Sequence, residues 1–157
     1  MDKIERDAPT AWRLTLMLAD SAQAVQGKLY VLGGGWTHTG PQPTPFAIAA
    51  IVNVPWAETN RRHMLKLQLV TSDGKPFLVP TPAGEQPLEI KAEFEVGRPP
   101  GITPGTPLAM PFAVNLGPLM LTPGRYEWRC SINDASNEDW KLPFEFRAAM
   151  PPFQISQ

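Results

Sequence analysis

The chain has 157 residues, of which 43% are hydrophobic and 18% charged, and its formal net charge is −1 at pH 7. This length suits one domain with a sizeable core, and this composition excludes an intrinsically disordered chain. Charge is nearly balanced and no basic cluster extends beyond Arg61 and Arg62, which argues against nucleic-acid binding.

The first ten residues, MDKIERDAPT, are charged and contain no apolar stretch. A secretory signal needs a basic start and an apolar core, so we expect cytoplasmic residence. The longest unbroken apolar run, residues 46–52, is far shorter than the about 20 residues of a membrane-spanning helix. The lone Cys130 cannot form an intrachain disulfide, in agreement with a reducing compartment.

Apolar and polar residues alternate along four segments, residues 12–18, 65–69, 88–96 and 108–116. Successive side chains of a strand point to opposite faces of its sheet, so each segment is expected to be a strand with one buried face. Residues 46–56 are apolar on both faces over most of their length, which predicts a central strand covered on both sides.

Glycine and proline clusters separate these segments, at the spacing typical of an all-β domain. We expect a single domain over residues 1–157 with short terminal tails. The predicted architecture is a two-sheet antiparallel β-sandwich of eight or nine strands, immunoglobulin-like or C2-like.

The C-terminal third carries the most specific pattern. Residues 121–126, LTPGRY, predict a turn followed by a strand, with Tyr126 placed like the tyrosine corner of immunoglobulin-like domains. A polar loop over residues 133–139 then leads to a last strand over residues 140–146. Pro143 lacks an amide donor, so this strand is expected at a sheet edge or with a bulge.

Two segments, LADSAQAVQGKLYVLGGGW (residues 18–36) and LTPGRYEWRCSI (residues 121–132), resemble a group of small bacterial proteins of unknown function. The resemblance covers most of the chain. It implies an intracellular β-sandwich of about this length, and it assigns no activity, cofactor or catalytic residue.

Several motifs are candidates for chemical sites. The glycine run 33–35 follows a predicted strand at residues 28–32, but the polar, proline-containing segment after it is a poor helix start, so a bulge or a close backbone approach is preferred to a phosphate loop. His38, His63 and Cys130 match no common zinc spacing, and Ser21 reads as a turn residue. The oxygen-rich loop 133–139 leaves calcium open as an alternative, with a solvated loop preferred. We therefore expect no catalytic, cofactor or metal residue.

The leading functional hypothesis is a non-enzymatic structural or protein-interaction module in a homo-oligomer or larger assembly, for instance a surface or decoration protein of a phage-like particle. The alternative is a small-ligand or carbohydrate-binding module that uses loop aromatics around Trp36, although a core-capping role for Trp36 is preferred. An enzyme without a recognisable motif is the third hypothesis. The expected contact residues are Trp36, His38, Pro99, Pro100, Pro151, Pro152 and Phe153.

Overall fold

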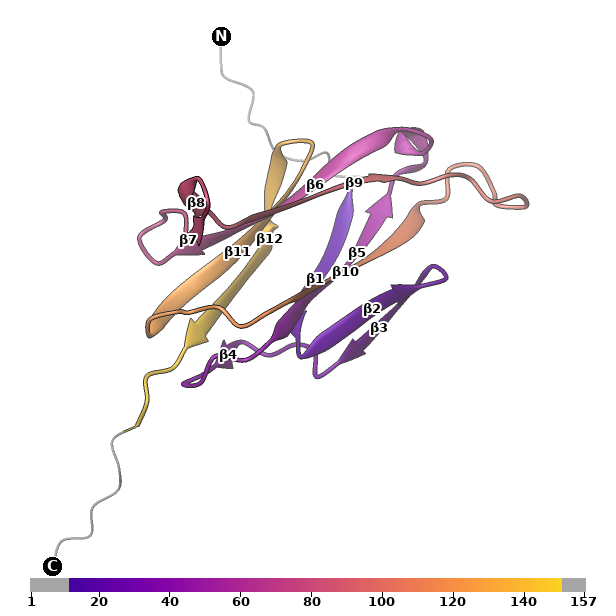
Figure 1. Ribbon diagram of the computed structural model, residues 1–157. Coiled ribbons are helices and arrows are strands. Elements are labelled where there is room, and N and C mark those ends of the chain that lie inside the picture. The colour runs from indigo at the N-terminus through magenta and orange to yellow at the C-terminus, as the bar shows by residue number, and fades with distance from the viewer. Residues whose placement is uncertain (1–11, 151–157) are drawn as a thin grey trace, which may run out of the picture.

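The computed structural model describes residues 12–150, and this part of the chain is all-β (Figure 1). Its helical content is one 3-10 turn, η1 (Trp56–Glu58). The strands are β1 (Arg13–Ala19), β2 (Ser21–Val25), β3 (Lys28–Leu32), β4 (His38–Thr39), β5 (Phe46–Val54), β6 (Arg62–Thr71), β7 (Leu78–Thr81), β8 (Gly84–Pro87), β9 (Glu89–Glu95), β10 (Leu108–Leu116), β11 (Gly124–Ile132) and β12 (Ala135–Phe146). Residues 12–150 hold no helix of the length and apolarity that crossing a membrane requires.

Two larger sheets and two hairpins make up the fold. One sheet has the order β1-β5-β10 and the other β4-β12-β11-β6-β9, while β2-β3 and β7-β8 are separate two-stranded sheets. The pairs are antiparallel except for the short parallel pair of β4 and β12. The strand predicted over residues 108–116 is present with the same bounds, as β10.

Strand β5 is central, as its two apolar faces predicted. It lies between β1 and β10 and is covered on both sides. One face, with Ile48 and Val52, joins the main core, to which both larger sheets contribute. The other face, with Ala47 and Ala49, packs against the β2–β3 hairpin in a second, alanine-rich cluster.

The described residues form twelve strands, more than the eight or nine expected. The four without a counterpart in the sequence patterns are β2, β4, β7 and β8. Ser21, expected as a turn residue, opens β2. This strand, SAQAV, is built mostly from small residues, so alternation is weak there. β7 and β8 each contain a proline, which disfavours a central strand.

The hairpin of β11 and β12 has a tighter turn than predicted. Asn133 and Asp134 both have positive φ, 53° and 66°, which is typical of a two-residue type I′ turn, and β12 already begins at Ala135. The prediction of a polar loop over residues 133–139 is therefore wrong. The strand with Pro143 was expected at a sheet edge or with a bulge, whereas β12 lies between β4 and β11. Its pairs with β4 are limited to Glu145 and Phe146, so at Pro143 itself β12 pairs with β11 alone.

Candidate functional site

The β2–β3 hairpin lies on the outer face of the three-stranded sheet (Figure 1). Its inward side chains, among them Ala22, Leu29 and Val31, contact Ala47 and Ala49 of β5. Four alanines of this cluster, at positions 19, 22, 47 and 49, are fully buried. Side chains this small let the hairpin backbone approach the sheet closely, so the hairpin is a packed part of the fold.

A side-chain amide fastens the hairpin to β10. The amide N–H of Ala22 donates to Oδ1 of Asn115 over 3.2 Å, and Nδ2 of Asn115 donates to the carbonyl oxygen of Ala22 over 2.8 Å. Asn115 thus pairs with the backbone of β2 as a neighbouring strand would. This bidentate contact satisfies the outward backbone groups of Ala22.

The glycine run lies at the base of the hairpin. Gly35 donates its backbone N–H to the carbonyl oxygen of Leu18 over 2.7 Å, and Gly33 has a φ of +63°. A Cβ at Gly34 would lie 2.7 Å from Val31 and 2.9 Å from Met17. The close backbone approach expected for residues 33–35 is confirmed.

The outward face of the hairpin carries three large apolar side chains. Val25, Tyr30 and Leu32 are 44%, 55% and 70% exposed. They share one face, because the cross-strand pairs Val25–Lys28, Gln23–Tyr30 and Ser21–Leu32 alternate with the inward pairs. An open hollow of about 530 Å³ runs along this region, lined by residues that include Tyr30, Leu32 and Asn115.

One backbone edge of the hairpin is free within the described residues. Ala22 points its N–H and C=O away from β3, towards Asn115, so the pair Ala22–Val31 is a non-hydrogen-bonded pair of the antiparallel ladder. By the same alternation, Leu29 and Val31 point their N–H and C=O groups away from β2. Neither residue has another backbone partner in residues 12–150. The site can therefore offer apolar surface together with backbone donors and acceptors.

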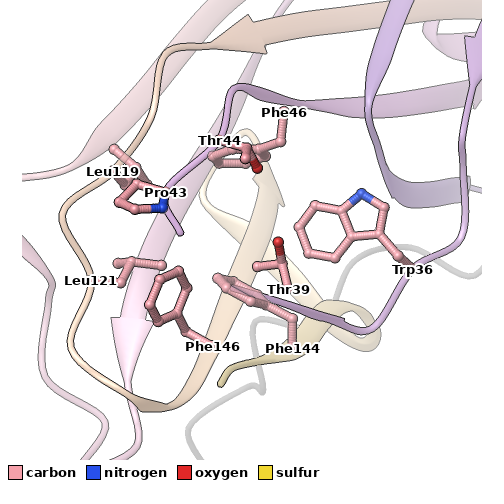
Figure 2. Close-up of a pocket in the computed structure, with 9 residues that line it drawn as sticks. All are labelled: Trp36, Thr39, Pro43, Thr44, Phe46, Leu119, Leu121, Phe144 and Phe146. Atoms are coloured by element: carbon pink, nitrogen blue, oxygen red, sulfur yellow. The ribbon is translucent and has the colours of Figure 1, made fainter. Parts of the chain in front are cut away.

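Trp36 is half-buried and caps the core at the start of β5, which is the role that the sequence favoured over an exposed binding residue. Its ring packs edge-to-face on Phe46, at 6.1 Å between centroids, and on Phe144, at 5.9 Å. Figure 2 shows the hollow beside it, lined by nine residues that include Leu119, Leu121 and Phe146. The hollow measures about 20 Å³, room for about one water molecule. A sugar ring would not fit into it.

The structure does not gather the other expected contact residues into one surface. His38, in β4, is exposed and lies opposite Glu145, near Trp36. Pro99 and Pro100 follow Arg98, whose guanidinium lies over the Trp56 ring. Trp56 lies just beyond the end of β5 that is opposite to Trp36, so at the usual rise per residue of a strand the two sites are roughly 25 Å apart. Pro151, Pro152 and Phe153 lie outside the described residues.

The three candidate metal ligands also lie apart. His38 is at the end of the five-stranded sheet where β12 finishes, and His63 is at the end where β12 begins. Cys130 is buried in β11, and burial raises the pKa of its thiol to about 12. Residues 12–150 contain no group of three or more His, Cys, Asp or Glu side chains arranged to hold a metal ion.

Buried His63 takes part in a structural hydrogen-bond network instead. Nδ2 of Asn133 donates to Nδ1 of His63 over 2.9 Å, so Nε2 carries the proton and donates to the carbonyl oxygen of Glu58 over 2.7 Å. Oδ1 of Asn133 accepts the N–H of Met64 over 2.9 Å. The network links the β11–β12 turn to β6 and η1.

Two of the three acidic residues in the segment 133–139, the candidate calcium loop, form ion pairs within the chain. Asp134 forms an ion pair with Lys66 at 3.4 Å, and Glu138 with Lys141 at 2.8 Å. The hydrogen bond and charge of Lys141 lower the pKa of Glu138. Because 135–139 belong to β12, these side chains do not sit together on one loop.

Sequence reasoning missed the outward face of the hairpin and its anchor, Asn115. A signal for the face was present, since LYVL at residues 29–32 is apolar on both faces, as is the strand at 46–54, yet it is short and follows an exposed Lys28. Nothing in the sequence signals the link from Asn115 to Ala22, because it joins positions 93 residues apart.

The chain matches the model of DUF6941, a family of unknown function, over residues 14–145. The match covers well over half of the chain, so the protein belongs to this family. The expected membership of a family of unknown function is confirmed. The matched range runs from β1 into β12 and includes the whole β2–β3 hairpin. No curated protein matches the chain significantly.

Proposed function

We propose that this member of DUF6941 is a non-enzymatic structural module that binds another protein chain through the β2–β3 hairpin. The observation that carries the proposal is the joint exposure of Val25, Tyr30 and Leu32 on one face of a firmly docked hairpin. Contiguous exposed apolar surface marks interaction sites, because its removal from water stabilises a complex by about 25 cal/mol per Å².

Rigidity of the hairpin supports this role. The contacts of Ala22 and Val31 with β5, and the two hydrogen bonds to Asn115, hold the hairpin in one position in the free protein. A partner would then bind without ordering a loop, and binding would not be weakened by that entropic cost.

We also infer that the two larger sheets are the layers of an immunoglobulin-like sandwich. Support comes from the main core, where side chains of both sheets such as Ile48 and Trp128 pack in one buried cluster. A second support is the hydroxyl of Tyr126, which donates to the backbone carbonyl of Thr122 four residues upstream, as in a tyrosine corner. Such sandwiches leave their outer faces available for contacts.

A pull-down from host extract, combined with light scattering of the purified full-length protein, tests the proposal. The double variant Tyr30→Ser/Leu32→Ser removes the apolar face, and we expect it to lose at least ten-fold in whatever association the unmodified protein shows. The matched control is Leu78→Ser, at an exposed apolar position on β7. Equal association of the double variant and the unmodified protein would contradict the proposal, as would a monomer that captures no protein.

A further inference from the structure

We propose that the partner of β3 is the β3 strand of a second copy of this chain, paired antiparallel about a two-fold axis at Tyr30. This inference rests on the proposed function and names the partner of the same hairpin. The pairing joins two hairpins into one four-stranded sheet with the order β2-β3-β3-β2.

The backbone of β3 has the geometry for this pairing. A two-fold axis at Tyr30 places Leu29 opposite the partner's Val31, and Val31 opposite the partner's Leu29. These are the two residues whose N–H and C=O groups point away from β2. Each such pair exchanges two hydrogen bonds, so the backbone supplies four. Tyr30 then faces the partner's Tyr30 as a non-hydrogen-bonded pair, in which side chains approach most closely.

The edge of β3 carries fewer of the charged residues that discourage strand addition than the edge strand β9 does. Strand β9, at the edge of the five-stranded sheet, carries Glu89, Lys91, Glu93 and Glu95. Charges of this kind discourage strand addition. In β3 the one charged residue is Lys28, next to the β2–β3 turn, and residues 29–32 carry no charge, proline or glycine. On the opposite edge of the hairpin, Asn115 already binds Ala22. Addition is therefore directed to β3.

The area available sets the strength of the dimer. Edge-to-edge pairing leaves the outward face of the hairpin open to solvent, so Tyr30 and Leu32 bury only part of their exposed area and Val25, on β2, buries none. Stable specific interfaces bury about 1,200–2,000 Å² in total. We therefore expect a reversible dimer that forms at high protein concentration, through hydrogen-bonded strand addition more than through area.

The variant Val31→Pro tests the pairing selectively. Proline removes an N–H that the β2–β3 ladder does not use, so the hairpin keeps its own hydrogen bonds, and edge positions tolerate proline. Val31→Thr is the matched control, because it keeps the N–H and the branched side chain. Circular dichroism and thermal unfolding establish that both variants fold.

Sedimentation equilibrium over a wide concentration range gives the readout. We expect the unmodified chain and Val31→Thr to approach twice the monomer mass as concentration rises, with dimerisation at least ten-fold weaker in Val31→Pro. Amide exchange at Leu29 and Val31 in the unmodified protein is expected to slow with concentration, a second readout that needs no variant.

Two results overturn the inference. One is equal dimerisation of Val31→Pro and Val31→Thr, and the other is an unmodified chain that stays monomeric with concentration-independent exchange at Leu29 and Val31. If that monomer still captures a host protein in a manner sensitive to Tyr30→Ser/Leu32→Ser, self-pairing fails while the proposed function stands.

Discussion

The hydroxyl of Tyr126 donates a hydrogen bond to the carbonyl oxygen of Thr122 over 2.6 Å and so closes the turn that leads into β11. The Tyr126 ring is buried, stacked on Phe144 at 5.7 Å and edge-on to Phe77 at 6.1 Å. The bond therefore fixes a side chain that the core already holds.

Tyr126→Phe keeps the ring contacts and removes this hydrogen bond. We expect the free energy of unfolding to fall by about 1–1.5 kcal/mol, because the Thr122 carbonyl loses its partner. Urea denaturation followed by tryptophan fluorescence measures the change. Tyr30→Phe, at an exposed position, is the control and is expected to leave the unfolding midpoint in place. A fall of equal size in both variants would contradict the role assigned to the Tyr126 hydroxyl.

Asn115→Ala removes both hydrogen bonds that fasten the hairpin to β10. We expect a loss of about 1–3 kcal/mol in unfolding free energy and faster amide exchange at Ala22, whose N–H loses its acceptor. Asn115→Asp keeps an acceptor but sets a carboxylate against the Ala22 carbonyl, so it should not restore stability. Gln23→Ala, exposed on the other hairpin face, is the control. Unchanged exchange at Ala22 in Asn115→Ala would show that packing alone holds the hairpin.

Ala49→Leu enlarges a buried side chain between β5 and the hairpin. Overpacking of this kind costs about 1–3 kcal/mol, since the hairpin must move away from the sheet. Differential scanning calorimetry would register this as a lower Tm. Ala109→Leu, at an exposed position of β10, adds the same atoms outside the cluster and is expected to have little effect. Equal Tm values for the two variants would mean that the alanine contact tolerates extra volume.

Asn133 contributes side-chain hydrogen bonds and also adopts a positive φ in the turn, and the variants Asn133→Gly and Asn133→Ala separate these two contributions. Both variants lose the side-chain hydrogen bonds to Met64 and His63, at a cost of about 1–2 kcal/mol. Glycine accepts the φ of 53°, whereas alanine is strained there, so we expect Asn133→Ala to be less stable than Asn133→Gly by about 1 kcal/mol. Urea denaturation ranks the two variants. The reverse order would contradict the left-handed turn.

Burial of Cys130 predicts a loss of stability in alkaline solution. The folded-state pKa of the thiol is about 12, against 9.0 for the ordinary group. Below pH 9 the thiol is protonated in both states, and its contribution to stability is fully present. As pH rises from 9 towards 12, the unfolded chain loses this proton first, so stability falls by about 1.4 kcal/mol per pH unit.

Cys130→Ala has no thiol at this position, so it lacks this pH dependence and serves as the reference for the unmodified protein. Between pH 8 and pH 11 we expect the unfolding free energy of the unmodified protein to fall relative to that of Cys130→Ala. Iodoacetamide should label the native thiol slowly, since only the thiolate reacts. A difference that is constant over this pH range would contradict the raised pKa.

Sequence alternation located the strands whose two faces differ most in polarity. β10 and β9 follow it closely, and the doubly apolar β5 is central because an exposed strand of that composition would aggregate. Prediction failed where local signals were weak. β2 consists mostly of small residues, and the polar side chains after Asn133 resemble a loop although they lie on the solvated face of β12. The free edge of β3 was missed because it depends on Asn115, distant in the sequence, occupying the other edge of the hairpin.

The contact between Ala22 and Asn115 also bears on the order of events during synthesis. The hairpin leaves the ribosome 93 residues before its anchor does. At about 5–20 residues per second, it waits roughly 5–20 s for Asn115 to emerge. During that interval the alanine face of β5 becomes available before β10 can complete the sheet. We expect nascent chains ending before β10 to expose this face and to depend on chaperones, and docking of the hairpin to be a late step of folding.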